Sequence, residues 1–266
     1  MKNFEPIDVA AWESFLLGGP SSLRNELGLS VERRRGAVAL FADGVDSMLL
    51  NRVLGVDLLS EDQLRGLLAE YERRGTRRLF AQAPEERLSA GSIQTLQSAG
   101  LVQYHRRWVE LVRRPGPVRQ AETDLRVGEA CAEHAESFSE ILSSGFDMPS
   151  SARPLWEGIL GGRVGWHCFV ALDGDRVAAG GALFVEEQRA CLVAAATAPS
   201  YRGRGAQQAL MTHRLARAFE LGCQTVYSET GEAVPGEPNP SYRNLIRHGF
   251  EPVGVRVNFV RPGTRW

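Results

Sequence analysis

Between residues 165 and 197 the chain alternates short apolar stretches with tight polar turns. The stretches GWHCFVAL, VAAGGALFV and ACLVAAAT are separated by the turns DGDR and EEQR. Apolar runs of this length that are joined by turn sequences are typical of β-hairpins. This region is therefore predicted to form three antiparallel strands in a meander.

A helical pattern follows the meander. In AQQALMTHRLARAFELG (206–222), apolar side chains recur on one helical face, and Gly222 ends the pattern. Other stretches of the C-terminal part show helical or strand patterns of their own. The remaining elements predicted here are helices at 124–146, 151–160 and 239–249 and strands at 223–230 and 250–261.

The first part of the chain also mixes helical and strand patterns. Asp8 is placed to cap a helix that ends at a pair of glycines. Ser60 and Gln63 have capping-box spacing ahead of the periodic stretch LRGLLAEYERR. The elements predicted here are helices at 9–17, 64–74 and 87–100 and strands at 37–42, 77–82 and 101–114.

The stretch RPGPVRQ (114–120) holds two prolines and a glycine and interrupts this succession of elements. Such segments are typical of linkers, so we predict an N-terminal α/β domain at 1–115 and a second domain at 121–266. Residues 95–115 and 244–262 share the order helix, glycine, long strand, arginine and proline. This similarity has two equally good explanations. Either a duplication made the first domain a degenerate copy of the second, or any connection between a helix and a strand would look like this.

Composition places the chain among ordinary globular proteins. Of its 266 residues, 43% are hydrophobic and 24% are charged, and the formal net charge is −1. Because no positive field is present, we expect no nucleic-acid partner and no membrane partner. The chain starts without a signal-peptide pattern, and its four cysteines form no CxxC pair. We therefore expect a cytoplasmic protein with reduced thiols and no metal; nothing in the sequence indicates an oligomeric state.

The segment APSYRGRGAQQAL (198–210) leads from the predicted meander into a helix. A turn into a helix presents free backbone N–H groups and a positive dipole end, and Gly203 and Gly205 allow a close approach, which suits a phosphate. A nucleoside-triphosphate loop requires a lysine and a hydroxyl after its last glycine, and neither is present. A dinucleotide-binding loop requires a third glycine, where Gln208 stands, and a parallel strand before it. An arginine-rich surface turn stays the alternative.

Thr197, Pro199, Arg202 and Gly205 stand as in the GNAT superfamily of N-acetyltransferases, whose strand-loop-helix signature reads roughly V-x-P-x-x-R-x-x-G-x-G/A. Thr197 replaces the usual valine, and Gln207 replaces the final small residue. The stretch GEPNPSYRNLIRHGF resembles the family's second signature, in which a helix that starts at an asparagine precedes Gly-Phe. The resemblance implies an α/β (α+β) fold with a mixed, mostly antiparallel sheet flanked by helices. If the first of the two domains is a degenerate copy of the second, the chain would contain two GNAT-like domains in tandem.

The resemblance further implies that acetyl-coenzyme A is the co-substrate and lies between two splayed strands. Backbone amides of the loop would hold its pyrophosphate, and the backbone of Ala195 and Thr197 would pair with its pantetheine arm. A strand amide would stabilise the oxyanion that forms when an amine attacks the thioester. The cofactor-binding residues expected from the resemblance are Ala195, Thr197, Arg202, Gly203, Arg204, Gly205, Ala206, Gln207 and Asn239.

The acid and the base are less clearly marked. Many family members carry a tyrosine four residues before the glycine of the second signature, where this chain has Leu245. Tyr242 falls near the same helical face and is the candidate acid, while packing within a short helix is its other interpretation. Glu229 ends a predicted strand and is the candidate base, or a solvated strand end. His167 is a second candidate base, or a half-buried strand residue.

Four aromatic or sulfur-containing side chains could line an apolar acceptor pocket or belong to the core: Phe146, Met148, Trp156 and Trp166. The leading hypothesis is an acetyl-coenzyme A dependent N-acetyltransferase that acts on a small-molecule or peptide amine. A non-catalytic acyl-coenzyme A binding or sensing module is the alternative, because Leu245 and Gln207 depart from the family pattern. A nicotinamide-dependent Rossmann enzyme is a third hypothesis.

Overall fold

The computed structural model describes residues 7–264 and divides into two compact units. Each unit is built from three separate segments of the chain. Within the described residues, unit 1 contains 7–15, 111–229 and 240–252, and unit 2 contains 16–110, 230–239 and 253–264. The domain limits at 115 and 121 stay a prediction.

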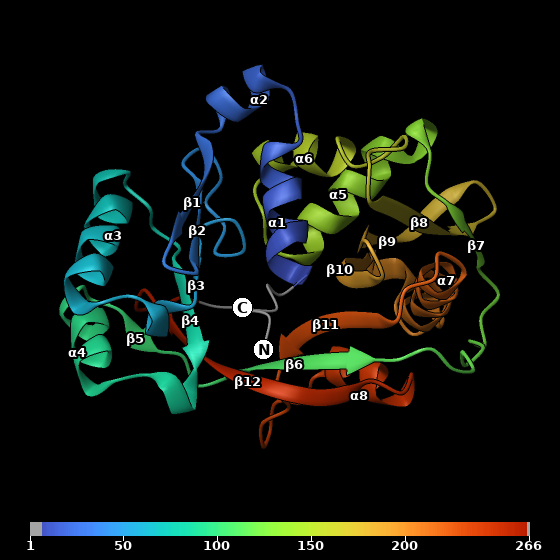
Figure 1. Ribbon diagram of the computed structural model, residues 1–266. Coiled ribbons are helices and arrows are strands. Elements are labelled where there is room, and N and C mark those ends of the chain that lie inside the picture. Colours follow the sequence, from blue (N-terminus) through green and yellow to red (C-terminus); the bar gives the residue numbers. More distant parts are fainter. Residues whose placement is uncertain (1–6, 265–266) are drawn as a thin grey trace. The chain divides into compact units, whose positions relative to one another are not determined.

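Unit 1 is built on a mixed sheet in which the strands follow the order β11-β10-β9-β8-β7 (Figure 1). The strands are β7 (Arg126–Glu129), β8 (Trp166–Asp173), β9 (Arg176–Glu186), β10 (Arg189–Thr197) and β11 (Thr225–Gly231). Strands β7 to β10 are antiparallel, whereas β11 pairs parallel with β10. The predicted meander is therefore confirmed, and β7 adds a fourth strand to it.

The helix predicted at 124–146 is wrong in its first part. Residues 126–129 form β7, and the α-helix α5 covers only Ala135–Gly145. Leu125 belongs to the cluster that contains Phe169 and Ala171, and Val127 packs against that cluster. This spacing of two residues on one side is that of a strand, and pairing with β8 prevails over the helical pattern.

Helices cover both faces of the unit 1 sheet. A Cβ added at Gly180 would lie 2.7 Å from Phe138 of α5, and one added at Gly181 would lie 3.2 Å from Arg214 of α7. Successive strand residues point to opposite faces, so α5 and α7 lie on opposite sides of β9. Besides α5, the α-helices with residues in unit 1 are α1 (Ile7–Leu17), α6 (Arg153–Glu157), α7 (Ala206–Glu220) and α8 (Pro240–Arg247).

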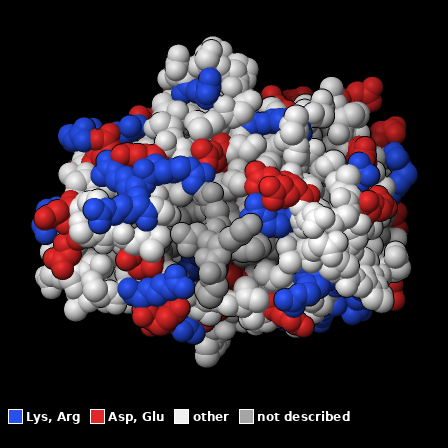
Figure 2. All heavy atoms as spheres, in the orientation of Figure 1, with Lys and Arg blue, Asp and Glu red and all other residues white. Residues whose placement is uncertain are grey.

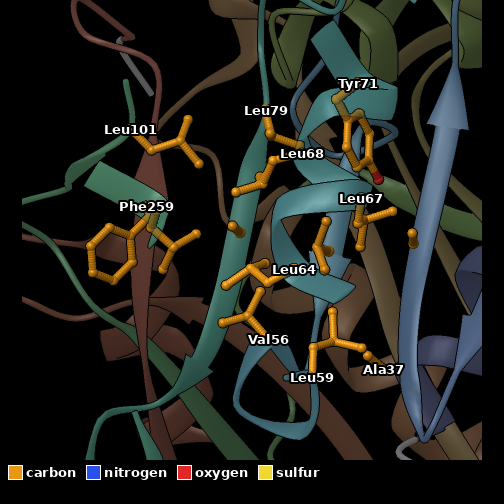
Figure 3. Packing of buried hydrophobic residues seen from close by; sticks show 14 of the residues in the cluster. Ala37, Val56, Leu59, Leu64, Leu67, Leu68, Tyr71, Leu79, Leu101 and Phe259 are labelled. Carbon is orange, nitrogen blue, oxygen red and sulfur yellow. The ribbon is translucent and has the colours of Figure 1, made fainter. Parts of the chain in front are cut away.

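Unit 2 contains hydrogen-bonded strands in the order β1-β2-β3-β4-β12, with both parallel and antiparallel pairs. Its strands are β1 (Leu29–Arg34), β2 (Ala37–Ala42), β3 (Arg52–Leu54), β4 (Phe80–Pro84), β5 (Val102–Gln103) and β12 (Glu251–Val260), and its helices are α2 (Ser21–Glu26), α3 (Glu61–Arg73) and α4 (Ala90–Ser98). The Ser60–Gln63 capping box is present at the start of α3. Leu64, Leu67 and Tyr71 of α3 pack against the strands and form much of the core (Figure 3).

The long strand predicted at 101–114 is broken. It consists of β5 and of β6 (Trp108–Arg113), with a turn between them. In that turn Arg107 forms an ion pair with Glu232 at 2.8 Å, and Arg106 one with Glu237 at 2.7 Å. These contacts, between residues far apart in the sequence, hold a bend that the local apolar pattern does not reveal.

Charged side chains of both signs are interspersed on the face shown in Figure 2. This distribution agrees with the formal net charge of −1. None of the helices between residues 7 and 264 combines the length and the apolar character needed to cross a bilayer.

Candidate functional site

Strands β10 and β11 part after a short parallel contact. Their pairing ends at Cys191 and Tyr227, although the strands continue to Thr197 and Gly231. Just beyond Cys191, the register of β10 against β9 shifts at Val193, which marks a β-bulge. A bulge bends the strand that carries it, so this irregularity accounts for the parting of the two strands.

A buried arginine lies against the bulge. Arg214 donates from Nη1 to the carbonyl oxygens of Ala194 (3.1 Å) and Ala182 (3.2 Å), and from Nε to that of Leu210 (3.2 Å). The side chain is 2% exposed, and burial lowers its pKa to about 10, which leaves the guanidinium charged near neutral pH. Arg214 therefore joins α7 to β9 and to β10 where β10 bends.

The loop after β10 reaches α7 through a 3₁₀ turn at Pro199–Tyr201 and two left-handed glycines. Gly203 has φ +83° and Gly205 has φ +79°. A Cβ at Gly205 would lie 2.3 Å from the carbonyl oxygen of Glu122, whereas a Cβ at Gly203 would meet no atom within 4 Å. Packing therefore requires glycine at 205, and Gly203 leaves open the approach to the N-terminus of α7.

The two arginines of the loop have different surroundings. Arg204 forms ion pairs with Asp124 and, at 2.9 Å, with Asp173, and its hydrogen bonds hold the pKa of both carboxyl groups below their usual values. Its carbonyl oxygen also accepts a hydrogen bond of 2.6 Å from Thr123 Oγ1. Arg202 is exposed and makes no side-chain hydrogen bond or ion pair within the described part of the chain. Arg204 thus anchors the loop, and the charge of Arg202 is available to an anion.

The two residues that depart from the family signature contact each other. Gln207 Nε2 donates a hydrogen bond of 2.9 Å to Thr197 Oγ1. The bond joins the last residue of β10 to the first turn of α7, across the loop. Thr197 and Gln207 therefore replace the valine and the small residue of the signature as a hydrogen-bonded pair.

The other expected cofactor-binding residues lie on different elements. Ala206 is buried at the start of α7, and Ala195 is half-buried on β10 beyond the bulge. Asn239 precedes α8, and its Nδ2 donates to Thr230 Oγ1 (3.2 Å) and to the carbonyl oxygen of Gly231. Asn239 thus connects the start of α8 to the end of β11. Cofactor binding by these three residues stays a prediction.

The candidate acid and base lie on α8 and β11. Tyr242 is half-buried on α8, and Leu245, at the position of the family's tyrosine, is only 4% exposed. Glu229 is half-buried near the end of β11. The roles of Tyr242 and Glu229 stay predictions. His167 lies near the start of β8, whereas Asp173, which binds Arg204, ends that strand, so His167 is remote from the loop.

The aromatic residues considered for an acceptor pocket mostly belong to the core. Trp156 and Trp166 are buried, and their rings lie 4.5 Å and 5.9 Å from that of Phe15. Met148 is buried as well, whereas Phe146 is half-buried. The core interpretation therefore holds for three of these four side chains.

Sequence reasoning missed Asp124 and Asp173, which hold the loop through Arg204, and Arg214, which holds the bend of β10. Each contacts residues distant in the sequence, and none belongs to a local motif. Between residues 7 and 264, no three His, Cys, Asp or Glu side chains come together in a way that could hold a metal ion.

The chain is similar to a protein-family model and to several solved structures. Residues 135–250 match the model of the acetyltransferase (GNAT) family. A GCN5-related N-acetyltransferase from Kribbella flavida has a similar structure, with 19% identity and a TM-score of 0.66 over 99% of this chain and 97% of its own. One from Sphaerobacter thermophilus has 14% identity and a TM-score of 0.58 over 98% and 94%.

A tandem GNAT protein from the clavulanic acid biosynthesis pathway is also similar, with 12% identity and a TM-score of 0.56 over 99% of this chain and 97% of its own. At these identities the likeness concerns the fold. It confirms the predicted fold class, a mixed and mostly antiparallel sheet flanked by helices. No curated protein matches the sequence.

Proposed function

Because residues 135–250 match the model of the acetyltransferase (GNAT) family, we propose that this chain is an N-acetyltransferase that transfers an acetyl group from acetyl-coenzyme A to an amine. One observation carries the proposal. Beside the point where β10 parts from β11, the loop before α7 offers an open Gly203 and an unpaired Arg202.

The residues of this loop fit a pyrophosphate. The first N–H groups of α7 lack partners within the helix, and the helix dipole favours an anion there. Gly203 allows a close approach, and Arg202 adds a free positive charge. Arg204, held by Asp124 and Asp173, keeps the loop in this conformation.

Strand β10 supplies the second part of the proposed site. Beyond the bulge, the edge of β10 that faces away from β9 is no longer paired with β11. Backbone groups of Ala195 and Thr197 on this edge would bind the pantetheine arm. Bound acetyl-coenzyme A would supply an acetyl group that is already activated as a thioester. The fixed backbone amides of β10 would then stabilise negative charge on the carbonyl oxygen.

We assign Glu229 as the residue that takes a proton from the acceptor amine and Tyr242 as the residue that gives one to the leaving sulfur. Tyr242 stands on α8 near Leu245, which is buried and carries no proton to give. The acceptor is a small-molecule or peptide amine. Assays with a panel of amines as acceptors would identify it.

A non-catalytic acyl-coenzyme A binding module is the second candidate function. The buried Leu245 favours it, because this position carries no acid. Thiol release from acetyl-coenzyme A, measured with a panel of amines, separates the two functions. We expect release that depends on the amine and that falls at least about tenfold in Tyr242→Phe and in Glu229→Gln. Tight binding of acetyl-coenzyme A without release for any amine would favour the binding module.

A further inference from the structure

Unit 1 contains a polar cavity that is remote from the loop that follows β10. Its volume is about 330 Å³, and it is lined by residues 159–165, by the start of β8, by the end of β7 and by Arg217 of α7. Arg217 lies about 16 Å along the axis of α7 from Ala206, the first residue of the helix. The cavity and the proposed pyrophosphate loop are therefore separate places on one helix.

Two arginines that line this cavity carry buried N–H groups without acceptors. Arg163 Nη2 and Arg217 Nε are buried and have no hydrogen-bond partner within the described part of the chain. Arg163 makes no ion pair there, and Arg217 lies 3.6 Å from Glu220 through Nη1 only. Buried charged donors are normally paired, because an unpaired one costs free energy. Within the described part of the chain, Arg163 thus lacks an anionic partner, and the Nε of Arg217 lacks an acceptor although its Nη1 pairs with Glu220.

The loop before β8 adds backbone donors. Gly161, Gly162 and Gly165 have φ angles of +76°, +91° and +82°. No amide from 161 to 165 donates to a backbone carbonyl among the described residues. Successive free N–H groups beside left-handed residues form a concavity that binds anions. At Gly165 a side chain is excluded, since its Cβ would lie 2.8 Å from the carbonyl oxygen of Val185.

The charges around the cavity also favour an anion. Among its described lining residues, Glu129 is the one carboxylate, and its side chain is exposed. His167 lines the cavity as well; burial lowers its pKa and Arg217 lowers it further, while Glu129 opposes this shift. Two fixed positive charges therefore face one exposed negative charge.

From these contacts we infer that the cavity binds a compact oxyanion, the phosphate group or the carboxylate group of a small ligand. Arg163, Arg217 and the amides of 161–165 are its donors. The site is distinct from the proposed acetyl-coenzyme A site. It would exist whether or not the chain transfers acetyl groups.

The imidazole of His167 provides a local probe of this site. Its NMR resonance, identified by its loss in His167→Gln, would be followed in the full chain during titration with inorganic phosphate and, separately, with malonate. Sodium chloride at equal ionic strength is the reference. We expect a saturable shift with at least one of the two anions and none with chloride. Because the probe lies in the cavity, phosphate held by the loop before α7 does not produce the same signal.

Substitution of the arginines tests their role. Arg163→Gln and Arg217→Gln should each weaken anion binding by at least about tenfold, since each removes a charge-assisted hydrogen bond. Arg126→Gln, which changes an exposed arginine of β7 that does not line the cavity, should leave binding unchanged. In buffer without oxyanions, Arg163→Gln should also raise the melting temperature, because it removes a partly buried charge without a partner.

Each outcome has a defined meaning. A shift with phosphate alone identifies a phosphate group, and a shift with malonate alone identifies a carboxylate; either result supports the inference, as does a shift with both. The inference is overturned if neither anion shifts the His167 resonance, or if Arg163→Gln and Arg217→Gln bind as the wild type does. If one of these two variants does not fold, anion binding by the other variant decides the test.

Discussion

At the scale of residues, a hydrogen bond joins Gln207 and Thr197, the two positions that depart from the family signature. The two side chains are 2.9 Å apart and join β10 to α7 across the loop. With a valine at 197 and a small residue at 207, no polar side-chain group at these two positions would need a partner. One substitution alone leaves a half-buried polar group without its partner.

This pairing predicts non-additive effects on stability. Thr197→Val and Gln207→Ala should each lower the free energy of unfolding, while the double variant should lose less than their sum, with a coupling of about 0.5–1.5 kcal/mol. Urea unfolding of the four proteins measures the coupling. The double variant should still bind acetyl-coenzyme A, because it restores the family pattern. Additive losses would show that the hydrogen bond does not form in solution.

Arg202 and Arg204 provide a matched pair, since they flank Gly203 on either side. Arg202 has no partner in the described chain, whereas Arg204 is held by Asp124 and Asp173. Arg202→Gln should weaken acetyl-coenzyme A binding by about tenfold with unchanged stability, because it removes a charge-assisted contact. Arg204→Gln should lower stability as well, because it releases the loop. Calorimetric titration and thermal unfolding of both variants check this, and equal effects on binding and stability in the two variants would contradict it.

At the scale of elements, the sequence predicts those whose pattern is local and repeated. The meander of β8 to β10, the helix α7 and the capping box of α3 follow from periodicity and turn residues. The sequence does not predict β7, because a helical pattern continues into it. It does not predict β1, because this strand carries charges, or β3, because this strand has only three residues. The break between β5 and β6 depends on Arg106 and Arg107, whose partners lie far along the chain.

The same limit applies to the site. Its loop has a sequence signature, so Gly203, Gly205 and Arg202 can be selected from the amino-acid sequence alone. The ion pairs of Arg204 and the contacts of Arg214 join residues from different elements, and no spacing in the sequence marks them. Sequence therefore predicts the groups that would meet a ligand and misses those that hold them.

The turn that follows α8 carries a buried histidine that predicts a dependence of stability on pH. His248 is 1% exposed, its Nδ1 donates to the carbonyl oxygen of Asn244 at 2.9 Å, and its Nε2 has no partner among the described residues. Burial lowers its pKa, the bond to Asn244 opposes this, and Arg113, Arg119 and Arg214 lower it further. Below a pH of about 6.5 the unfolded chain gains a proton that the folded chain excludes, so stability falls toward acid pH.

His248→Gln should reduce this decline. The measurement is urea unfolding at several pH values between about 7 and 5, the range in which a free histidine titrates. His213→Gln is the matched control, because His213 makes the same contact to the carbonyl oxygen four residues before it, at 2.9 Å, but is exposed. An unchanged pH slope in His248→Gln, or an equal change in His213→Gln, would show that burial of His248 is not the cause.

At the scale of the whole molecule, unit 2 repeats part of the order of unit 1. In both, a strand leads through a 3₁₀ turn into a helix, and a parallel strand follows: β3, α3 and β4 in one, β10, α7 and β11 in the other. This order supports the prediction that the N-terminal domain, 1–115, is a degenerate copy of the second domain. The tandem GNAT protein with a similar fold agrees with it.

The corresponding segment of unit 2, from β3 through α3 to β4, lacks the features that would hold a pyrophosphate. Strands β3 and β4 stay together through Leu54 and Gln82, and the amide of Gly55 still donates to the carbonyl oxygen of Gln82 at 3.0 Å. The turn that follows carries Asp57, and α3 begins with Glu61. Negative charge and a closed strand pair both disfavour an anionic cofactor there. We therefore expect one acetyl-coenzyme A molecule per chain.

The most direct test of the account is a calorimetric titration of the full chain with acetyl-coenzyme A. One molecule should bind per chain. Gly203→Asp should weaken binding by at least about tenfold through charge repulsion, whereas Gly203→Asn, which tolerates the left-handed backbone equally well, should have a much smaller effect. Two binding sites, no binding, or equal losses in the Asp and Asn variants would contradict the claim that the loop before α7 holds the pyrophosphate.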